Sequence, residues 1–394
     1  MPVPREEIAS TLSSRLRRSH NVPIVQLRAP GISRLQTLIT DHADLGALAA
    51  RLEGARAVAL DTEFLRERTY RAELCLVQIT DGESAVCVDP VALGDVGALA
   101  PLAHARGTLK VMHASRQDIE GLMPAGGLVH PVFDTQIAAA LVGLPAQIGY
   151  AELVRRRLGI ELEKAHTRAD WSARPLAPEL ISYALDDVRY LLPLAEQLTA
   201  ELERLGRSGW LAEELAALAD PAAYQVEPEQ AWLRLKGMRG LDAARARLAR
   251  ELAAWRERRA IERNRPRGWI LDDAALREIV LAAPRSLGEL AAMPGVPPGV
   301  VKHCGTEILA RVRAADLPDE LPTVNLRGRP DRAKAALLER LSAIHRAAAA
   351  ELSLSPEVLA TRRDLERLAE GRRDGPLLVG WRRAALGERL LAAL

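Results

Sequence analysis

One stretch decides the fold: Ala57-Val58-Ala59-Leu60-Asp61-Thr62-Glu63-Phe64, an apolar run that ends in two acidic residues one position apart. An apolar run of this length is typical of a buried strand. Side chains at positions i and i+2 of a strand lie on the same side of the sheet, so Asp61 and Glu63 should project together. Like charges this close need a divalent cation or a shared proton between them. Taken alone, the pair is more often a strand end with two solvated acids, because short motifs match by chance.

Strand and helix patterns alternate around this stretch. Leucine and isoleucine at helical spacing predict a helix over 33–53, before the strand. The patterns after it predict strands over 74–79, 85–88 and 109–112, with a helix over 93–104. Asp81-Gly82 is a hairpin turn signal between the first two of these strands. Three successive strands should therefore form a meander.

A further acidic residue, Asp118, follows the strand at 109–112. Ser115 is a residue type favoured at helix N-caps, which places Asp118 in the first turn of a helix. Ligands bind at that edge of the sheet in open α/β folds. An acid that compensates the helix dipole explains Asp118 equally well. Asp134 precedes an apolar helix predicted over 136–144, and we interpret it chiefly as the cap of that helix.

A long helix predicted over 179–205 carries Tyr183 and Asp187, four residues apart and therefore one turn apart on one face. Such pairs are common on exposed helices, so this pair is weak evidence by itself. The loop before the helix, residues 164–176, packs cations, hydroxyls and the indole of Trp171 into a short segment. That composition suits contact with phosphate and a stacked base, although a surface loop anchored by Trp171 has the same composition.

The three acidic elements together are far more specific than any one of them. In order and spacing they resemble the three exonuclease motifs of the DEDD superfamily. The segments 60–64, 133–139, 170–176 and 183–192 are similar to those of bacterial ribonuclease D. One branch of the superfamily has a histidine five residues before its last aspartate, where this chain has Ser182. Tyr183 is therefore typical of the tyrosine branch.

The resemblance implies an α/β ribonuclease H-like exonuclease domain over 33–210, with a mixed sheet flanked by helices, after a flexible extension over 1–32. It implies two divalent cations, Mg²⁺ or Mn²⁺, held by Asp61, Glu63, Asp118 and Asp187, whose oxygens suit such hard ions. Tyr183, with an ordinary phenol pKa near 10, would orient the attacking water rather than act as a base. The side chains predicted to contact substrate are Thr62, Phe64, His113, Lys164, Arg168, Trp171, Arg263, Arg265 and Arg267.

After a linker at 220–229 the chain becomes almost wholly helical. Helices are expected over 241–264, 272–281, 286–292 and 299–313, and then over 331–352 and 355–370. The segment 263–273 resembles the HRDC domain that ribonuclease D shares with certain helicases. A weak repeat suggests a second, divergent copy. We therefore predict two small all-α HRDC-type helical domains, over 225–315 and 325–394.

Charge is distributed unevenly along the chain. Residues 1–220 carry 23 basic and 29 acidic side chains, whereas residues 221–394 carry 31 basic and 23 acidic ones. This asymmetry is expected if the front half holds metal ions and the rear half attracts a polyanion. The densest basic run lies between Arg256 and Arg267. A solvated helix face with ion pairs to Glu257 and Glu262 is an equal alternative to phosphate binding.

Several classes are excluded by what the sequence lacks. No apolar run is long enough for a membrane span, no secretory signal is visible, and Cys75, Cys87 and Cys304 suit reduced core thiols. No phosphate-binding loop of the Walker type is present, so no nucleoside triphosphate cofactor is expected. These features predict a cytoplasmic protein, which we expect to be a monomer.

The resemblance implies a 3′→5′ exoribonuclease that releases nucleoside 5′-monophosphates from RNA with a free 3′ end, such as tRNA precursors. Two alternatives stay open at this point. A DNA 3′→5′ exonuclease of the same fold would use the same acids, because nothing in the motifs reads a 2′-hydroxyl. A catalytically silent nucleic-acid-binding protein would not need to keep acids that repel one another without metal.

Overall fold

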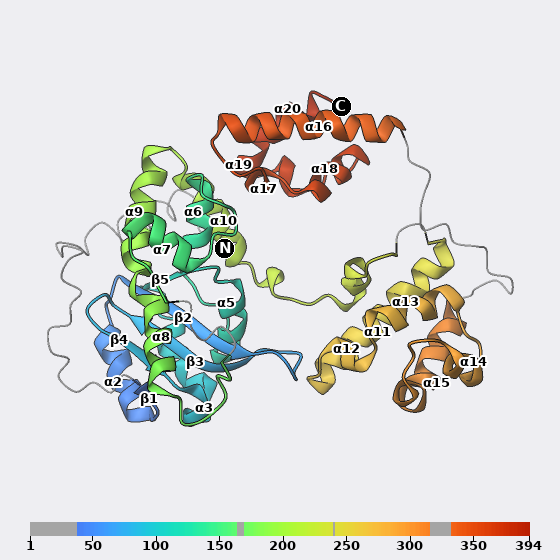
Figure 1. Ribbon diagram of the computed structural model, residues 1–394, viewed down its shortest axis with the longest axis horizontal. Coiled ribbons are helices and arrows are strands. Elements are labelled where there is room, and N and C mark those ends of the chain that lie inside the picture. Colours follow the sequence, from blue (N-terminus) through green and yellow to red (C-terminus); the bar gives the residue numbers. More distant parts are fainter. Residues whose placement is uncertain (1–37, 164–168, 239–240, 316–331) are drawn as a thin grey trace. The chain divides into compact units, whose positions relative to one another are not determined.

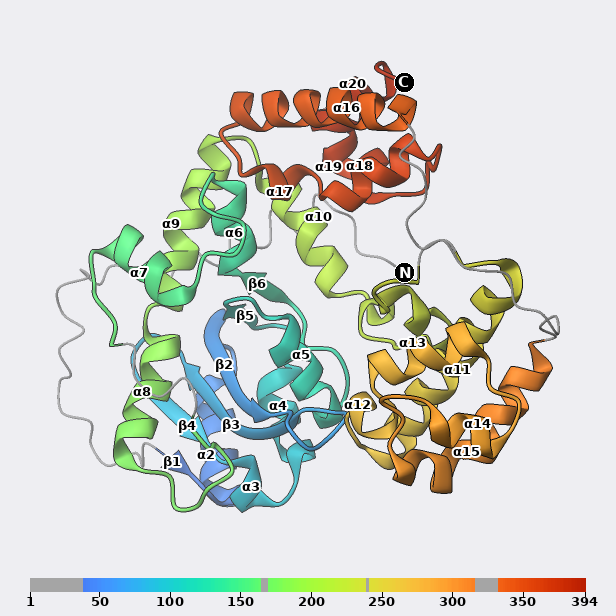
Figure 2. The ribbon, with the colours of Figure 1, turned by 45° about the vertical axis from the view of Figure 1, so that its right-hand side comes forward.

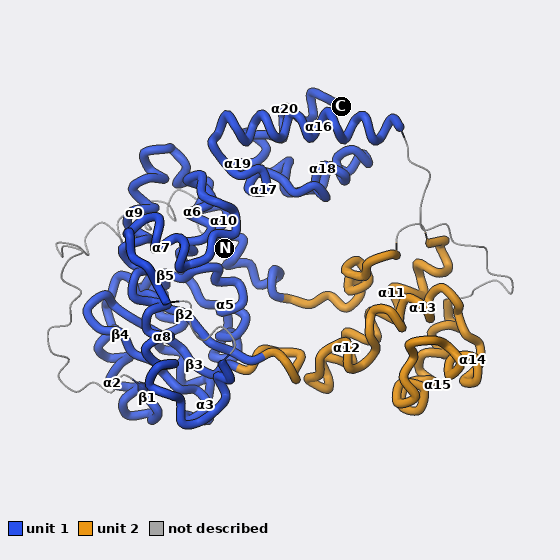
Figure 3. The backbone as a smooth tube through the Cα atoms, in the orientation of Figure 1, with its two compact units in different colours: residues 1–65, 74–224, 331–394 blue, residues 66–73, 225–330 orange. Residues whose placement is uncertain are grey.

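The computed structural model describes residues 38–163, 169–238, 241–315 and 332–394. The chain divides into two compact units (Figure 3). Unit 1 comprises residues 1–65, 74–224 and 331–394, and unit 2 comprises residues 66–73 and 225–330. Two segments therefore belong to a different unit from the residues that precede them in the sequence. The short loop 66–73 belongs to unit 2, and the C-terminal segment belongs to unit 1.

A six-stranded sheet in the order β1-β4-β3-β2-β5-β6 forms the centre of unit 1 (Figures 1 and 2). The strands are β1 Leu38–Ile39, β2 Ala57–Leu65, β3 Glu73–Thr80, β4 Ala85–Val88, β5 Leu109–Met112 and β6 Val132–Asp134. Strands β3 and β4 pair antiparallel, whereas the pairs β1–β4, β2–β5 and β5–β6 are parallel. The sheet is therefore mixed, as the sequence predicts.

The N-terminal part of unit 1 contains nine α-helices among its described residues, between and after the strands of the sheet. They are α2 His42–Leu52, α3 Pro90–Leu93, α4 Ala100–Ala103, α5 Arg116–Leu122, α6 Thr135–Leu141, α7 Tyr150–Leu158, α8 Pro178–Arg189, α9 Leu191–Arg204 and α10 Ser208–Leu218, with the 3₁₀ turns η2 Val96–Leu99 and η3 Met123–Ala125. The three cysteines are free and buried, as predicted. No helix among the described residues is long and apolar enough to cross a membrane.

Three predicted helices have different limits in the structure. The helix predicted over 33–53 begins only after the N-cap Asp41, because Leu38 and Ile39 pair with β4 instead. The stretch 93–104 holds three short helical pieces, since Gly94 ends α3 in the left-handed region at φ 67°. The long helix predicted over 179–205 breaks at Tyr190 into α8 and α9.

The C-terminal segment shares the core of unit 1. It contains α16 Arg332–Glu351, α17 Pro356–Leu359, α18 Arg362–Ala369, η6 Pro376–Leu378, α19 Gly380–Arg382, the π-helical turn η7 Arg383–Gly387 and α20 Glu388–Leu391. Its leucines lie in one buried cluster with residues of α6, α9 and α10. Trp381 stacks on Trp210 of α10 at 4.5 Å between ring centroids and donates from Nε1 to Glu214 at 2.7 Å. Removing this segment would therefore expose the core of unit 1.

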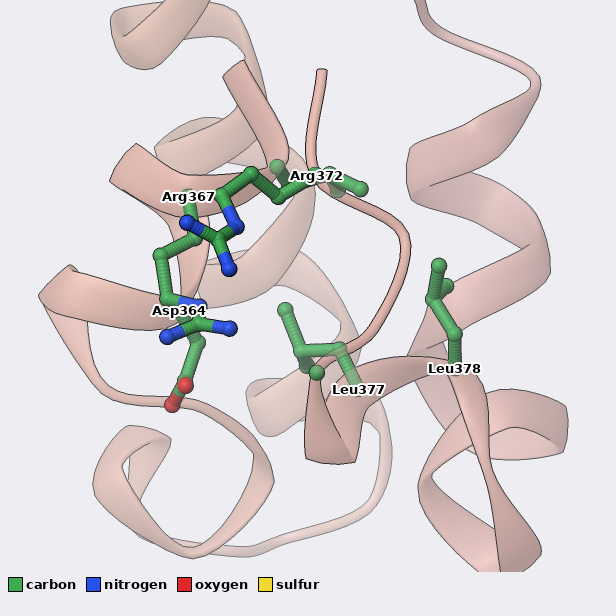
Figure 4. Close-up of a pocket in the computed structure, with 7 residues that line it drawn as sticks. Asp364, Arg367, Arg372, Leu377 and Leu378 are labelled. Atoms are coloured by element: carbon green, nitrogen blue, oxygen red, sulfur yellow. The ribbon is translucent and has the colours of Figure 1, made fainter. Parts of the chain in front are cut away.

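A shallow hollow lies on the C-terminal segment between α18 and η6 (Figure 4). Arg367 and Arg372 line it, and each pairs with Asp374, at 3.1 Å and 3.0 Å. The two guanidinium groups that line the hollow therefore share one carboxylate.

Unit 2 is helical. Its helices are α11 Ala243–Arg263, α12 Arg267–Ile270, α13 Asp273–Ala282, α14 Leu287–Ala292 and α15 Pro298–Ala314, preceded by the 3₁₀ turn η5 Pro228–Arg234. Helix α11 begins at the N-cap Asp242 and ends at Asn264, which adopts the left-handed conformation at φ 46° before Pro266. These bounds agree with the sequence prediction, since Pro266 cannot continue the helix.

Candidate active site

Strand β2 supplies two of the predicted acids. Its pairing with β5 covers Ala57, Val58 and Ala59, so Asp61 and Glu63 lie on the part of β2 beyond that pairing. Both side chains are partly buried. Thr62, between them, is only 5% exposed, as expected from the alternation of side chains along a strand.

Asp118 lies in the first turn of α5 and is buried. The hydroxyl of Thr62 donates to its Oδ1 at 2.6 Å. Thr62, predicted to contact substrate, is thus a buried support for Asp118. Ser115 is the N-cap residue of α5, as predicted, but its side chain makes no capping bond; its backbone N–H and its hydroxyl donate to Asp134 Oδ2, at 2.7 Å and 2.8 Å.

Asp134 joins two helix starts. Besides Ser115, it accepts hydrogen bonds from the backbone N–H groups of Gln136 and Ile137, at 2.8 Å and 3.2 Å, which caps α6 as predicted. One buried carboxylate therefore fixes the first turn of α6 and the backbone immediately before α5. Through α5 it positions Asp118.

Helix α8 carries Tyr183 and Asp187 one turn apart. Its C-terminal end is held by Tyr150 of α7, whose hydroxyl donates to Asp186 O at 2.9 Å and accepts from Tyr190 N at 3.2 Å. These two bonds satisfy backbone groups at the break between α8 and α9. Tyr150 thereby fixes the helix end that holds Asp187.

The pKa shifts of the four acids indicate that their carboxyl groups lie near one another. Burial, and then the charges of Asp118, Asp187 and Glu63, raise the pKa of Asp61 well above its ordinary value. Burial followed by Asp187 and Asp118 raises the pKa of Glu63 to about 8. Burial is also the main cause that raises the pKa of Asp118 to about 7, and that of Asp187 to about 7. Carboxylates from β2, α5 and α8 therefore share one partly buried, mutually repelling site.

The donor set fits a hard divalent cation. Four carboxylates offer the oxygen ligands that Mg²⁺ and Mn²⁺ prefer, and a cation would offset the burial and the repulsion that raise the pKa values of Asp61 and Glu63. Within the described residues, no three His, Cys, Asp or Glu side chains already stand in the geometry of a metal site. The fit accordingly rests on donor chemistry and electrostatics.

The ring of Trp171 packs against the ring of Tyr183. The two rings stack at 6.4 Å between centroids and 29° between planes, and Trp171 is only 5% exposed. Trp171 is held in turn by Arg174, whose guanidinium donates to Trp171 O at 2.7 Å and binds the buried Asp89 at 2.6 Å. Trp171, predicted as a stacking surface for substrate, packs against Tyr183. Burial, followed by the nearby acids, raises the pKa of Tyr183 to about 12.

The other predicted substrate contacts are spread over the molecule. His113 is enclosed, with Nδ1 2.8 Å from Thr135 Oγ1 and Nε2 3.0 Å from Ile148 O, and burial lowers its pKa. Phe64 is partly buried on β2. Lys164 and Arg168 lie outside the described residues.

The basic run of α11 is divided between paired and unpaired arginines. Arg256 is 2% exposed and binds Asp273 at 2.7 Å, Arg259 binds Glu307 at 2.7 Å, and Arg258 binds Glu229 at 2.9 Å. Arg267 lies 3.7 Å from the buried Glu257. Arg263 and Arg265 are exposed. The alternative of a face held by ion pairs is therefore correct for part of the run, although most of the acids differ from those expected.

Sequence reasoning missed the supporting residues Tyr150, Arg174 and Asp89. Asp89 and Arg174 are separated by 85 residues, and Tyr150 and Asp186 by 36. No local periodicity links such positions. The only available signal was the unusual density of polar residues around Arg174.

Comparisons with known proteins agree with this geometry. Residues 36–203 match the family model for 3′-5′ exonuclease, and residues 245–312 match the model for the HRDC domain. The ribonuclease D of Gluconacetobacter diazotrophicus is 41% identical over 361 residues, which cover 90% of this chain and 92% of that protein. The ribonuclease D of Zymomonas mobilis is 38% identical over 372 residues, with coverage of 92% and 94%.

A solved structure is similar over nearly the whole chain. The crystal structure of Escherichia coli RNase D, an exoribonuclease involved in structured RNA processing, superposes with a TM-score of 0.81 at 31% identity. The match covers 92% of this chain and 98% of that one. Both the sheet unit and the helical regions thus have counterparts in a single relative.

The raised pKa values predict how stability changes with pH in EDTA. A carboxyl whose pKa is raised by folding contributes stability that is complete below its unfolded pKa of 3.8 for Asp or 4.5 for Glu, and lost as pH rises through the folded values of about 7 and about 8. A tenfold change in a proton-binding constant corresponds to about 1.4 kcal/mol. We therefore expect the thermal midpoint in EDTA to fall between about pH 4.5 and pH 8.5, and Mg²⁺ to restore it at the upper end of that range.

Thermal unfolding of wild type and two variants checks this expectation. Glu63→Gln removes one repelling acid and should flatten the decline with pH. Glu152→Gln is the matched control, because Glu152 is exposed and its arginine partners lower its pKa to about 2, outside the tested range. Identical pH profiles for wild type and Glu63→Gln would contradict the raised pKa of Glu63.

Proposed function

This chain belongs to the ribonuclease D family and is a hydrolytic exoribonuclease, and we propose that it shortens structured RNA, such as tRNA precursors, from the 3′ end with two divalent cations. The proposal rests chiefly on the four acids of β2, α5 and α8: after burial, the charges of Asp118 and Asp187 raise the pKa of both Asp61 and Glu63, beside the phenol of Tyr183. The relative in Escherichia coli acts in structured RNA processing, which supports this substrate class. The predicted monomeric state and cytoplasmic location stay predictions.

In the proposed mechanism, Asp61, Glu63, Asp118 and Asp187 hold the cations. Bound there, Mg²⁺ or Mn²⁺ would lower the pKa of the attacking water and stabilise the charge on the leaving oxygen. Asp61, whose pKa is raised by burial and by the charges of the other three acids, would be one of the residues that hold the cations. Thr62 holds one oxygen of Asp118, so the carboxylate keeps a fixed orientation.

Tyr183 orients the attacking water. Because its pKa is raised to about 12, the phenol stays protonated at neutral pH and acts through a hydrogen bond rather than by removing a proton. Cleavage between phosphorus and the 3′ oxygen of the preceding nucleotide releases a nucleoside 5′-monophosphate. The water supplies the hydroxyl on the phosphate, and the 3′ oxygen takes up a proton.

We predict that Asp61→Asn and Asp187→Asn each abolish release of nucleotides while RNA binding persists. Each change removes a charged ligand but keeps the shape of the side chain. The assay follows a 5′-labelled, stem-containing RNA with a 3′ tail, and its DNA counterpart, in Mg²⁺, Mn²⁺ or EDTA. Asp186→Asn is the control, because Asp186 lies next to Asp187 yet pairs with Arg189 at 2.6 Å. Full activity of Asp61→Asn would overturn the assignment, and equal cleavage of DNA would remove the preference for RNA.

A second prediction concerns the support of Tyr183. Trp171→Ala should lower kcat by about 10- to 100-fold, because displacement of a positioned group by about 1 Å has effects of that size. KM for RNA should change little, since Trp171 is buried. Trp171→Phe keeps an aromatic ring under Tyr183 and should restore most of kcat. A loss of kcat in Trp171→Ala that vanishes once the fraction of folded protein is corrected for would contradict the positioning role.

A further inference from the structure

In unit 2, the loop 66–73 is fastened to the end of α11. The backbone N–H groups of Tyr70 and Arg71 both donate to Asn264 Oδ1 at 3.1 Å. The hydroxyl of Tyr70 donates to Glu257 Oε1 at 2.5 Å, and Arg267 lies 3.7 Å from the same oxygen. Glu257 is fully buried, and the contacts with Tyr70 and Arg267 offset the free-energy cost of burying its carboxylate. Two segments about 190 positions apart in the sequence thus form one continuous surface.

Both segments bring exposed arginines to this surface. The loop contributes Arg68 and Arg71, the last residue of α11 is Arg263, and the turn after this helix contributes Arg265. No carboxylate among the described residues pairs with any of these four guanidinium groups, in contrast to Arg256, which binds Asp273. Glu67, Glu73 and Glu262 are the exposed acids on the same two segments, one fewer than these four arginines. Net positive charge therefore remains available to a polyanion.

An exposed indole lies on α12, the short helix that follows this turn. Trp269 is 60% exposed, although Trp255 of the same unit is only 4% exposed. The guanidinium of Arg265 lies over its ring, 5.8 Å from the centroid. A large aromatic surface kept open beside unpaired cations has the composition of a platform for a nucleic-acid base, with the arginines beside it for phosphates.

We propose that Arg68, Arg71, Arg263, Arg265 and Trp269, together called the Trp269 patch, bind an unpaired stretch of the RNA. One base stacks on Trp269, and neighbouring phosphates lie against the arginines. An unpaired stretch is required, because bases inside a duplex are already stacked and cannot offer a face to the indole. This inference rests on the proposed RNA substrate and adds the place where the RNA is held outside the catalytic acids.

The loop gives the patch a covalent connection to the active site. Residues 66–73 continue directly from β2, which carries Asp61 and Glu63. The chain therefore passes from the catalytic strand into the RNA-binding surface without an intervening element. Neither Arg68 nor Arg71 would belong to this surface without the bonds from Tyr70 and Arg71 to α11.

The test uses the full chain, because residues 332–394 share the core of the catalytic unit. Binding of a fluorescein-labelled oligoadenylate of about 12 nucleotides is followed by anisotropy in EDTA over a series of salt concentrations. Trp269→Ala should weaken binding by about 5- to 100-fold with an unchanged salt slope, the range measured for loss of one stacked base. Trp269→Phe should retain most of the affinity.

The charge component has a different signature. Arg263→Ala combined with Arg265→Ala should reduce the slope of log affinity against log salt by about 1.4, at about 0.7 for each single-strand phosphate contact. Lys302→Ala combined with Arg313→Ala is the matched control, because both residues are exposed cations on a different helix of unit 2, α15, and the slope should not change. A fully paired RNA duplex should bind more weakly and should not respond to Trp269→Ala.

The outcomes separate this inference from the proposed function. Unchanged affinity in both patch variants, while wild type still shortens RNA, would overturn the Trp269 patch and leave the proposed function standing. Wild type that neither binds nor shortens RNA would overturn the proposed function itself. If Trp269→Ala lowered the affinity for duplex RNA as much as the affinity for the oligoadenylate, the result would contradict the proposal that an unpaired base stacks on Trp269. Because Trp269 is exposed, an unchanged thermal midpoint should accompany its substitution.

Discussion

Mutual repulsion among four carboxylates is the constraint on which the rest of the catalytic unit depends. Asp61 and Glu63 are placed together by the two-residue period of β2, while Asp118 and Asp187 come from α5 and α8. Burial makes the repulsion stronger, as the raised pKa values indicate. Neutral side chains outside the four acids hold the site in place. The hydroxyl of Thr62 binds Asp118, and the phenol of Tyr150 binds the end of α8. The buried indole of Trp171 stacks on Tyr183.

Much of the site could be predicted from the sequence because its chemistry follows local periods. The alternation of a strand places Asp61 beside Glu63, and one helical turn places Tyr183 beside Asp187. The break at Tyr190 could not be predicted, since the apolar pattern runs through it and the break depends on Tyr150, 40 positions away. The burial of Trp171 was equally invisible, because an indole in a polar loop has the same sequence signature whether it faces RNA or Tyr183.

Whether an arginine is free for RNA is also decided by tertiary contacts. Arg256 and Arg265 lie in one basic run, yet Arg256 binds Asp273. Arg265 pairs with no carboxylate of the described residues and lies over the ring of Trp269. The sequence also gives no sign that the loop 66–73 joins unit 2, or that residues 332–394 join the core of unit 1. The acidic front half and the basic rear half of the sequence therefore do not correspond to the two units of the fold. Acids gather on β2, α5 and α8, and the exposed Arg265 lies over the ring of Trp269.

The most direct test of the account is the number of protons released when Mn²⁺ binds. Calorimetric titration at pH 7 in buffers of different ionisation enthalpy measures that number. Acids with pKa values raised to about 7 and about 8 are partly protonated at this pH and must lose protons to hold a cation. The account predicts binding with proton release at pH 7 that declines toward pH 9 and is reduced in Glu63→Gln. Mn²⁺ binding without proton release at pH 7, or no binding at all, would contradict it.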